Sequence, residues 1–311
     1  LKEFDAYVGN EMASVKESIL TAVRVFEDER QLVQREIDAG RQVKPDDWPC
    51  VNFRFVGPPG SGKTSIAGIT ARYLNARGIL PTSKVITVNA TQLIRSHVGE
   101  TAQLLREAAD RADGGVLIID EFQGFESAYQ GGNVAQDAMR AIVQIVNEKR
   151  NSLCIIAAGY EADVERVFKF DDGADRRFPH TIEFKNYSSD SLMSILDSVL
   201  EKRGRSIAPE ARPLVKRVIE SDIAVKGDHF GNAGYLKDTL VPQLTASLLK
   251  SEETRNIFTA DDVLSAFPDK RNILLKTDKS AEEVLREFDS YVGPEMESIK
   301  AEIIASVNMF A

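Results

Sequence analysis

The chain has 311 residues, 43% of them apolar and 28% charged, which are the proportions of an ordinary soluble globular protein. The formal net charge of −9 leaves no basic surplus to hold a phosphate backbone, so we expect no nucleic-acid partner. No apolar stretch reaches the roughly 18 residues of a membrane span. The two cysteines, Cys50 and Cys154, lack metal-ligand spacing and fit a reducing compartment. We therefore expect an intracellular, cytoplasmic protein with no membrane partner.

The opening residues, 1–12, return near the end of the chain. They have the sequence LKEFDAYVGNEM, and residues 285–296 have the sequence LREFDSYVGPEM. The match continues in constant register as far as Phe26 and Phe310. A repeat at this distance has the length of a domain rather than of a solenoid unit. We therefore predict one full module of a longer tandem array, with a linker and the start of a second module at residues 271–311.

Between the two copies, short apolar runs typical of buried strands alternate with amphipathic patterns typical of helices. The strands are predicted at residues 51–56, 84–89, 115–120, 153–158 and 181–184. The helices are predicted at residues 63–74, 101–112 and 135–149, with a short one from residue 161. This alternation predicts the α/β class, with a doubly wound parallel sheet and helices on both of its faces.

The pattern changes after the fifth strand, because from Ser189 onward no further strand is expected. Amphipathic helices are predicted there at residues 189–204, 209–222, 232–250 and 260–266. We therefore predict three parts ahead of the linker. They are an N-terminal helix with its connection at residues 1–50, an α/β core at 51–187 and a helical subdomain at 188–270.

The eight residues after the first strand, GPPGSGKT at positions 57–64, fit the phosphate-loop pattern GxxxxGK[ST] in full. The glycines let successive backbone N–H groups turn inward around phosphates, and the following helix directs its positive end at the same anion. Lys63 would supply charge to the β and γ groups, and the Thr64 hydroxyl would ligate Mg²⁺. The residues expected to bind the nucleotide are Pro59, Gly60, Ser61, Gly62, Lys63, Thr64 and Ser65. The sequence therefore predicts ATP and Mg²⁺ as ligands.

The third predicted strand ends in two carboxylates, Asp120 and Glu121. Beside a phosphate loop, the first carboxylate is expected to hold the hydrated magnesium ion and the second to polarise the attacking water. Without such a loop, the same pattern would describe only a strand that meets solvent. Together the two motifs predict an ATPase with Lys63 and Glu121 as catalytic residues.

These motifs and four further stretches resemble the AAA+ ATPases of the red-type Rubisco activase and stage V sporulation protein K branch. The further stretches are VGETA at 98–102, AAGY at 157–160, GADRRFPH at 173–180 and HFGNA at 229–233. The resemblance covers nearly the whole module. It implies a P-loop AAA+ fold whose C-terminal helices form a lid, a hexameric ring of such modules, and a protein client that the ring pulls or remodels with ATP.

The resemblance also implies roles for residues outside the two motifs. Arg177 would be the arginine finger, which reaches the γ-phosphate held by the neighbouring module, and Arg176 is a rival candidate. Val8 and Gly9 would lie against the adenine, although the same two residues also fit a plain turn before a helix.

Three positions depart from the pattern of this branch. The arginine expected in the lid corresponds to Gly234, so a cation near the γ-phosphate is missing unless another residue, for example Lys237, replaces it. The aromatic residue of the pore loop corresponds to His97, which presents less apolar surface. The polar residue often found at the end of the fourth strand corresponds to Gly159 and Tyr160.

We therefore predict a ring module that hydrolyses ATP and exerts force on a protein client near His97 and the loop at residues 123–134. One alternative is a nucleotide-binding structural module with little or no turnover, which Gly234 favours. A second alternative is a nucleic-acid motor, which the acidic charge disfavours. His180 and His229 have no metal-ligand spacing and are expected to be core or surface residues.

Overall fold

The computed structural model describes residues 10–44, 47–94, 99–127, 134–250 and 256–275. By its internal contacts the chain divides into two compact units, residues 1–266 and 267–311. The described part of the second unit forms a 3₁₀ turn, η5 (Pro268–Lys270), and a short helix, α15 (Arg271–Leu274). The second copy of the sequence repeat, residues 285–310, lies outside the described residues, so the tandem arrangement stays a prediction.

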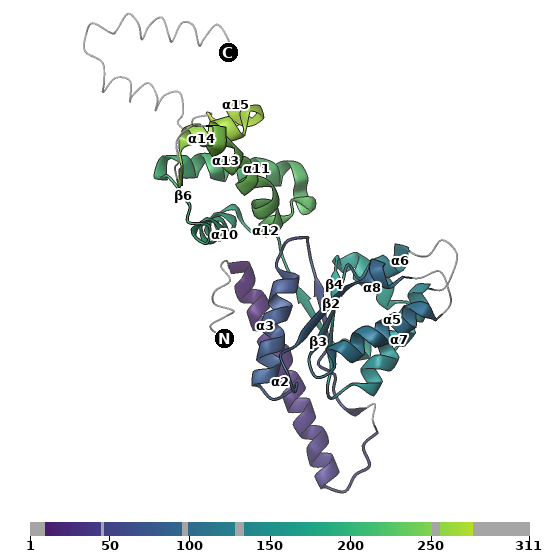
Figure 1. Cartoon of the computed structure of the whole chain (residues 1–311). Coiled ribbons are helices and arrows are strands. Elements are labelled where there is room, and N and C mark those ends of the chain that lie inside the picture. The colour runs from purple at the N-terminus through teal and green to yellow at the C-terminus, as the bar shows by residue number, and fades with distance from the viewer. Residues whose placement is uncertain (1–9, 45–46, 95–98, 128–133, 251–255, 276–311) are drawn as a thin grey trace, which may run out of the picture. The chain divides into compact units, whose positions relative to one another are not determined.

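A five-stranded parallel sheet forms the centre of the first unit (Figure 1). In the order of the sheet, its strands are β2 (Val85–Asn89), β3 (Val116–Asp120), β4 (Cys154–Gly159), β1 (Phe53–Val56) and β5 (His180–Glu183). Strand β1 pairs in parallel with both β4 and β5, so the first strand of the chain lies inside the sheet. In open sheets of this kind, ligands bind beyond the carboxyl ends of the strands. The predicted α/β parallel sheet is confirmed.

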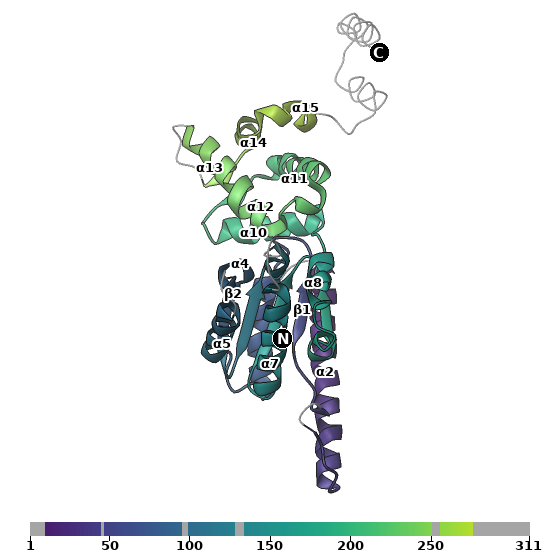
Figure 2. The same ribbon diagram turned by 90° about the vertical axis from the view of Figure 1, so that its right-hand side faces the viewer.

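The strands could be predicted from apolar runs in the sequence because helices cover both faces of the sheet. All six residues of β4 and the first four of β3 are buried. Figure 1 shows α2 (Asn10–Asp38) and α3 (Lys63–Ala76) on one face of the sheet, and α5 (Glu100–Ala112), α7 (Val134–Glu148) and α8 (Glu161–Phe168) on the other. In the turned view, α5 and α7 lie side by side over the strands (Figure 2).

Three single-turn helices of the α/β core were not predicted: α4 (Ala90–Leu93), α6 (Gly124–Ser127) and α9 (Ala174–Arg177). Each has four residues, which is too short to show a helical period in the sequence. Helix α4 directly follows β2, α6 begins shortly after β3, and α9 lies between α8 and β5. The longer predicted helices and the five strands of the core are present, with ends shifted by at most two residues.

The rest of the first unit is mainly helical. Its elements are α10 (Ser189–Glu201), β6 (Ser206–Ile207), η2 (Pro209–Ala211), α11 (Arg212–Lys226), η3 (Gly227–His229), α12 (Asn232–Tyr235), η4 (Leu236–Leu240), α13 (Val241–Lys250), β7 (Ile257–Phe258) and α14 (Ala260–Ala266). The expectation that strands end before Ser189 was wrong, since β6 and β7 pair in parallel. Two-residue strands leave no alternation to detect. The helix predicted at 232–250 is interrupted by a π-helical turn, η4.

Helix α2 is 29 residues long, and only its first half is buried against the sheet. Met12, Val15, Ile19, Val23 and Phe26 are each at most 5% exposed. Beyond them, the carboxylate of Glu27 accepts two hydrogen bonds from the guanidinium of Arg77, which follows α3. No helix among the described residues is long and apolar enough to cross a membrane.

Candidate nucleotide-binding site

The phosphate loop connects β1 to α3 and makes two unusually close backbone contacts. A Cβ atom at Gly57 would lie 2.2 Å from the carbonyl oxygen of Phe184, at the end of β5. A Cβ atom at Gly60 would lie 1.9 Å from the carbonyl oxygen of Gly231, in the lid. Both glycines also have positive φ angles, 146° and 67°. Only glycine fits these two positions, so the loop is held between β5 and the lid.

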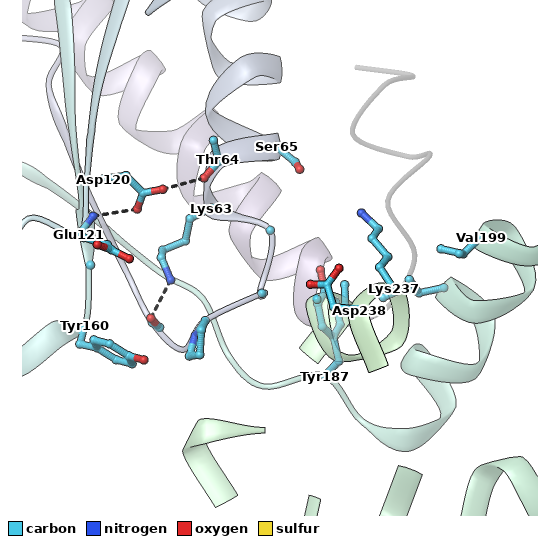
Figure 3. Close-up of a pocket in the computed structure, with 18 of the residues that line it drawn as sticks. Lys63, Thr64, Ser65, Asp120, Glu121, Tyr160, Tyr187, Val199, Lys237 and Asp238 are labelled. Atoms are coloured by element: carbon cyan, nitrogen blue, oxygen red, sulfur yellow. Dashed lines mark hydrogen bonds between the residues drawn. The ribbon is translucent and has the colours of Figure 1, made fainter. Parts of the chain in front are cut away.

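A cavity of about 700 Å³ opens at this loop (Figure 3). Of the residues predicted to bind the nucleotide, those that line it are Pro59, Gly60, Gly62, Lys63, Thr64 and Ser65. Ser61 lies beneath the loop instead, fully buried, and its hydroxyl donates to the Pro58 carbonyl oxygen at 2.8 Å. Asp120 and Glu121 line the same cavity. The two motifs that the sequence identified therefore meet in one place.

Lys63 projects from the start of α3 into the loop. Its Nζ donates to the carbonyl oxygens of Gly57 and Pro58, both at 2.8 Å. Burial lowers the pKa of this ammonium from 10.5 to about 8, and the negative charge of Asp120 opposes that shift. The ammonium is thus partly desolvated, with two backbone oxygens and the Asp120 carboxylate near it. Phosphate oxygens would supply the charge that this environment lacks, so the loop fits a polyphosphate.

Thr64 and Asp120 form the pair expected to hold magnesium. The Thr64 hydroxyl donates to Oδ2 of Asp120 at 3.2 Å, and Oδ1 accepts the backbone N–H of Glu121 at 2.9 Å. The described residues contain no group of three or more His, Cys, Asp or Glu side chains that could hold a metal ion. One hydroxyl and one carboxylate suit Mg²⁺, which keeps several waters and takes its remaining ligands from substrate phosphates.

Glu121 is exposed in the cavity and has a strained backbone. Its φ of 49° is uncommon for a residue other than glycine, and such strain gathers at functional sites. Asn89 ends β2 directly beside Asp120 in the sheet register, and its Nδ2 donates to Oε2 of Glu121 at 2.7 Å. The amide oxygen of Asn89 is held in turn by the backbone and hydroxyl of Thr91. Asn89 therefore fixes the Glu121 carboxylate, a role that the sequence analysis missed.

The lid is joined to the phosphate loop through Asn232. This side chain is fully buried, with a left-handed φ of 48°. Its Nδ2 donates to the carbonyl oxygen of Pro59 at 3.0 Å and to Oδ1 of Asn186 at 2.8 Å, while its Oδ1 accepts the N–H of Tyr187 at 2.9 Å. The Tyr187 hydroxyl donates to the carbonyl oxygen of Ser61 at 3.2 Å. One amide thus ties together the loop, the lid and the segment that connects the lid to the core.

The lid also contributes to the cavity wall. Gly234 lies where the resemblance places an arginine, and it lines the cavity together with Lys237 of the π-helical turn. Figure 3 shows Lys237 and Asp238 across the cavity from Asp120 and Glu121. The remaining lid residues of the wall are Ile195, Ser198, Val199, Lys202 and Ala233. Lys237 is therefore a positively charged residue of the lid that lines the proposed nucleotide cavity.

Arg177 ends α9 and is half-buried. Its Nε donates to Oδ1 of Asn147 at 3.2 Å, and its backbone oxygen accepts from Nδ2 of Asn52 at 2.9 Å. Among the described residues that line the cavity, neither Arg177 nor Arg176 is found. Val8, Gly9 and His97 lie outside the described residues, so their predicted roles stay predictions.

Comparison with known proteins matches residues 53–186 to the family model "ATPase family associated with various cellular activities (AAA)". The protein CbbX of Cereibacter sphaeroides is 30% identical over 194 residues, which are 62% of this chain and 62% of the relative. A CfxQ homolog of Galdieria sulphuraria is 28% identical over 196 residues, 63% of this chain and 64% of the relative. The chain thus spans less than two thirds of the length of both relatives.

Among solved structures, the RuvB Holliday junction branch migration motor of Thermotoga maritima is similar with a TM-score of 0.54. Its sequence is 17% identical, and the alignment covers 85% of this chain and 70% of that one. At this identity the likeness concerns the fold alone. The fold is that of a P-loop AAA+ protein with a parallel sheet and a C-terminal helical lid, as predicted.

Proposed function

We propose that this chain, whose residues 53–186 form an AAA ATPase domain, binds ATP with Mg²⁺ and hydrolyses it. The observation that carries the proposal is the convergence of Lys63, Thr64, Asp120 and Glu121 on one cavity of about 700 Å³. These residues come from the phosphate loop and from the end of β3, the two places that a P-loop hydrolase requires.

Each residue of the group has a distinct part in hydrolysis. The backbone of the loop and the Lys63 ammonium hold the β- and γ-phosphates, and the start of α3 adds its positive end. Thr64 and Asp120 would hold Mg²⁺, which neutralises charge on the phosphates when bound. Glu121, fixed by Asn89 at 2.7 Å, accepts a hydrogen bond from the attacking water and polarises it towards the γ-phosphate.

Arg177 is proposed to act on the nucleotide of a neighbouring module. It lies on α9, apart from the residues that line the cavity of its own module. An arginine in that position stabilises the transition state only if a second module places its cavity against it. The proposal therefore includes a ring of modules, hexameric by the resemblance to the red-type Rubisco activase and stage V sporulation protein K branch.

We also propose that the ring uses the energy of ATP hydrolysis to remodel a protein client. The resemblance of the sequence to ring-forming ATPases of that branch supports it, and so does the net charge of −9, which disfavours nucleic acid. We further propose that the repeat at residues 285–310 begins a second module of a tandem array. The alternative is a nucleotide-binding assembly module with little turnover, for which Gly234 in place of a lid arginine is the specific argument.

Steady-state ATP hydrolysis at several protein concentrations tests the proposal, with Glu121→Gln and Arg177→Ala measured beside the unmodified chain. Glu121→Gln should bind ATP normally and lower kcat by about 100-fold or more, because it removes the acceptor for the water proton. Arg177→Ala should lower turnover per chain at high concentration, where modules meet. Turnover that rises with concentration and falls in both variants supports a ring ATPase.

The opposite results are equally clear. Tight ATP binding without measurable turnover, on this chain and on a longer chain that includes the next module, would favour the assembly module. A chain that binds no ATP at millimolar concentration would contradict the proposal altogether.

A further inference from the structure

Gln123 has a buried amide oxygen without a partner at the edge of the nucleotide cavity. The buried side-chain atoms of the described residues that lack a hydrogen-bond partner include Nε of Arg54 and Oε1 of Gln123. Of these residues, only Gln123 lines the cavity. Nearly all buried polar atoms in native proteins are hydrogen-bonded, so an unpartnered one needs an explanation, and beside a ligand site a ligand or its ordered water supplies one.

The amide of Gln123 lies where a side chain at position 159, the end of β4, would otherwise be. Strand β4 ends at Gly159, which also lines the cavity and has no side chain to offer. A Cβ atom built on Gly159 would lie 2.5 Å from Oε1 of Gln123. The end of the Gln123 side chain therefore occupies the volume that any residue other than glycine would fill at position 159.

The amide of Gln123 lines the same cavity as the residues proposed to surround the γ-phosphate. Gln123 follows Glu121 by two residues, and both line the cavity with Asp120 and Lys63. The last torsion of a glutamine side chain has a broad preference, so a rotation there turns either the oxygen or the NH₂ group towards the cavity at little cost. No other side chain or backbone group described in this chain holds the amide by a hydrogen bond.

We propose that Gln123 is a positioning residue of the ATPase, whose amide hydrogen-bonds the attacking water beside the γ-phosphate from the place left open by Gly159. This rests on the proposed ATP hydrolysis. The amide takes no proton and forms no covalent bond. It orients the water so that Glu121 can polarise it.

Gln123→Met tests the proposal, because methionine has nearly the same size and shape but cannot donate or accept comparable hydrogen bonds. The matched control is Gln103→Met, since Gln103 is an exposed glutamine of α5 that bonds only Glu107 in a surface pair. Titration calorimetry would measure affinity for ADP and for ADP with aluminium fluoride, a mimic of the transferring phosphoryl group. We expect Gln123→Met to keep its ADP affinity and to bind the mimic about tenfold more weakly, with kcat about tenfold lower.

A rescue variant guards against a merely structural effect. A Cβ at position 159 would also lie 2.8 Å from Cγ2 of Val164, so Gly159→Asn is combined with Val164→Ala. Added to Gln123→Ala, these two changes return an amide to the same volume from β4, and they should recover most of the affinity for the mimic that Gln123→Ala with Val164→Ala loses. The proposal is overturned if Gln123→Met binds the mimic as the unmodified chain does, or if ADP and the mimic weaken equally. An unmodified chain that binds neither nucleotide would instead contradict the ATPase proposal itself, and the role of Gln123 with it.

Discussion

Replacing Asn232 with alanine would test how the lid is fixed to the phosphate loop. The change removes three hydrogen bonds of 2.8–3.0 Å. The N–H of Tyr187 would become a buried donor without a partner, which costs about 1–3 kcal/mol. The acceptors on Pro59 and Asn186 are more accessible and can take water instead. Alanine in the left-handed conformation at φ 48° adds about 1 kcal/mol. We therefore expect Asn232→Ala to lower the free energy of unfolding by about 2–4 kcal/mol.

Urea denaturation followed by circular dichroism measures this change, and Asn232→Gly separates its two causes. Glycine loses the same hydrogen bonds but adopts a positive φ without strain. The strain of about 1 kcal/mol that glycine avoids is partly offset by its extra flexibility in the unfolded chain, so the glycine variant should be up to about 0.5 kcal/mol more stable than the alanine variant. The reasoning fails if both variants unfold within about 0.5 kcal/mol of the unmodified protein, since the amide would then contribute nothing to joining the lid and the loop.

Three further predictions concern the same cavity. Burial lowers the pKa of Lys63 from 10.5 to about 8. Below pH 8 the side chain is charged in both the folded and the unfolded chain, and its burial as a cation destabilises the ligand-free fold. This destabilisation is relieved as the pH rises from 8 towards 10.5, because the folded chain then loses the proton while the unfolded chain keeps it. ATP affinity should accordingly fall between pH 7 and 9.5, and fluorescence titration should find no such trend in Lys63→Met. Gly60→Ala places a Cβ 1.9 Å from the Gly231 carbonyl oxygen, so it should lower the thermal midpoint by several degrees or more and abolish ATP binding. Arg177→Ala should reduce concentration-dependent turnover while Arg176→Ala, which changes an exposed side chain, should not; the reverse result would move the proposed finger to Arg176.

The sheet and the two catalytic motifs could be predicted because their signals are local. A strand buried on both faces needs a continuous apolar run, and β3 and β4 supply it with Val116–Asp120 and Cys154–Gly159. The phosphate loop needs glycines at fixed spacing ahead of a lysine and a hydroxyl. Each requirement is met within a few neighbouring residues, so the sequence shows it without knowledge of the fold.

The contacts that organise the cavity could not be predicted, because they join residues far apart in the chain. Asn89 reaches Glu121 only because β2 and β3 lie in register. Asn232 meets Pro59 across 173 positions. An asparagine near a helix start is ordinarily expected to cap that helix, so nothing local distinguishes Asn232 from a cap. The same holds for Gln123, whose position beside Gly159 follows from the pairing of the strands and not from its neighbours.

These long-range contacts bear on how hydrolysis could move the lid. Asn232 bonds the carbonyl oxygen of Pro59 inside the phosphate loop, and the backbone N–H of Ala233 donates to the carbonyl oxygen of Gly60 at 3.2 Å. The lid therefore grips the loop through backbone oxygens, the groups that point away from the phosphates when the N–H groups turn inward. A change in the loop would therefore move those oxygens and alter the hydrogen bonds of the lid. Because these bonds need no charged side chain, the lid can respond to the nucleotide even with glycine at position 234.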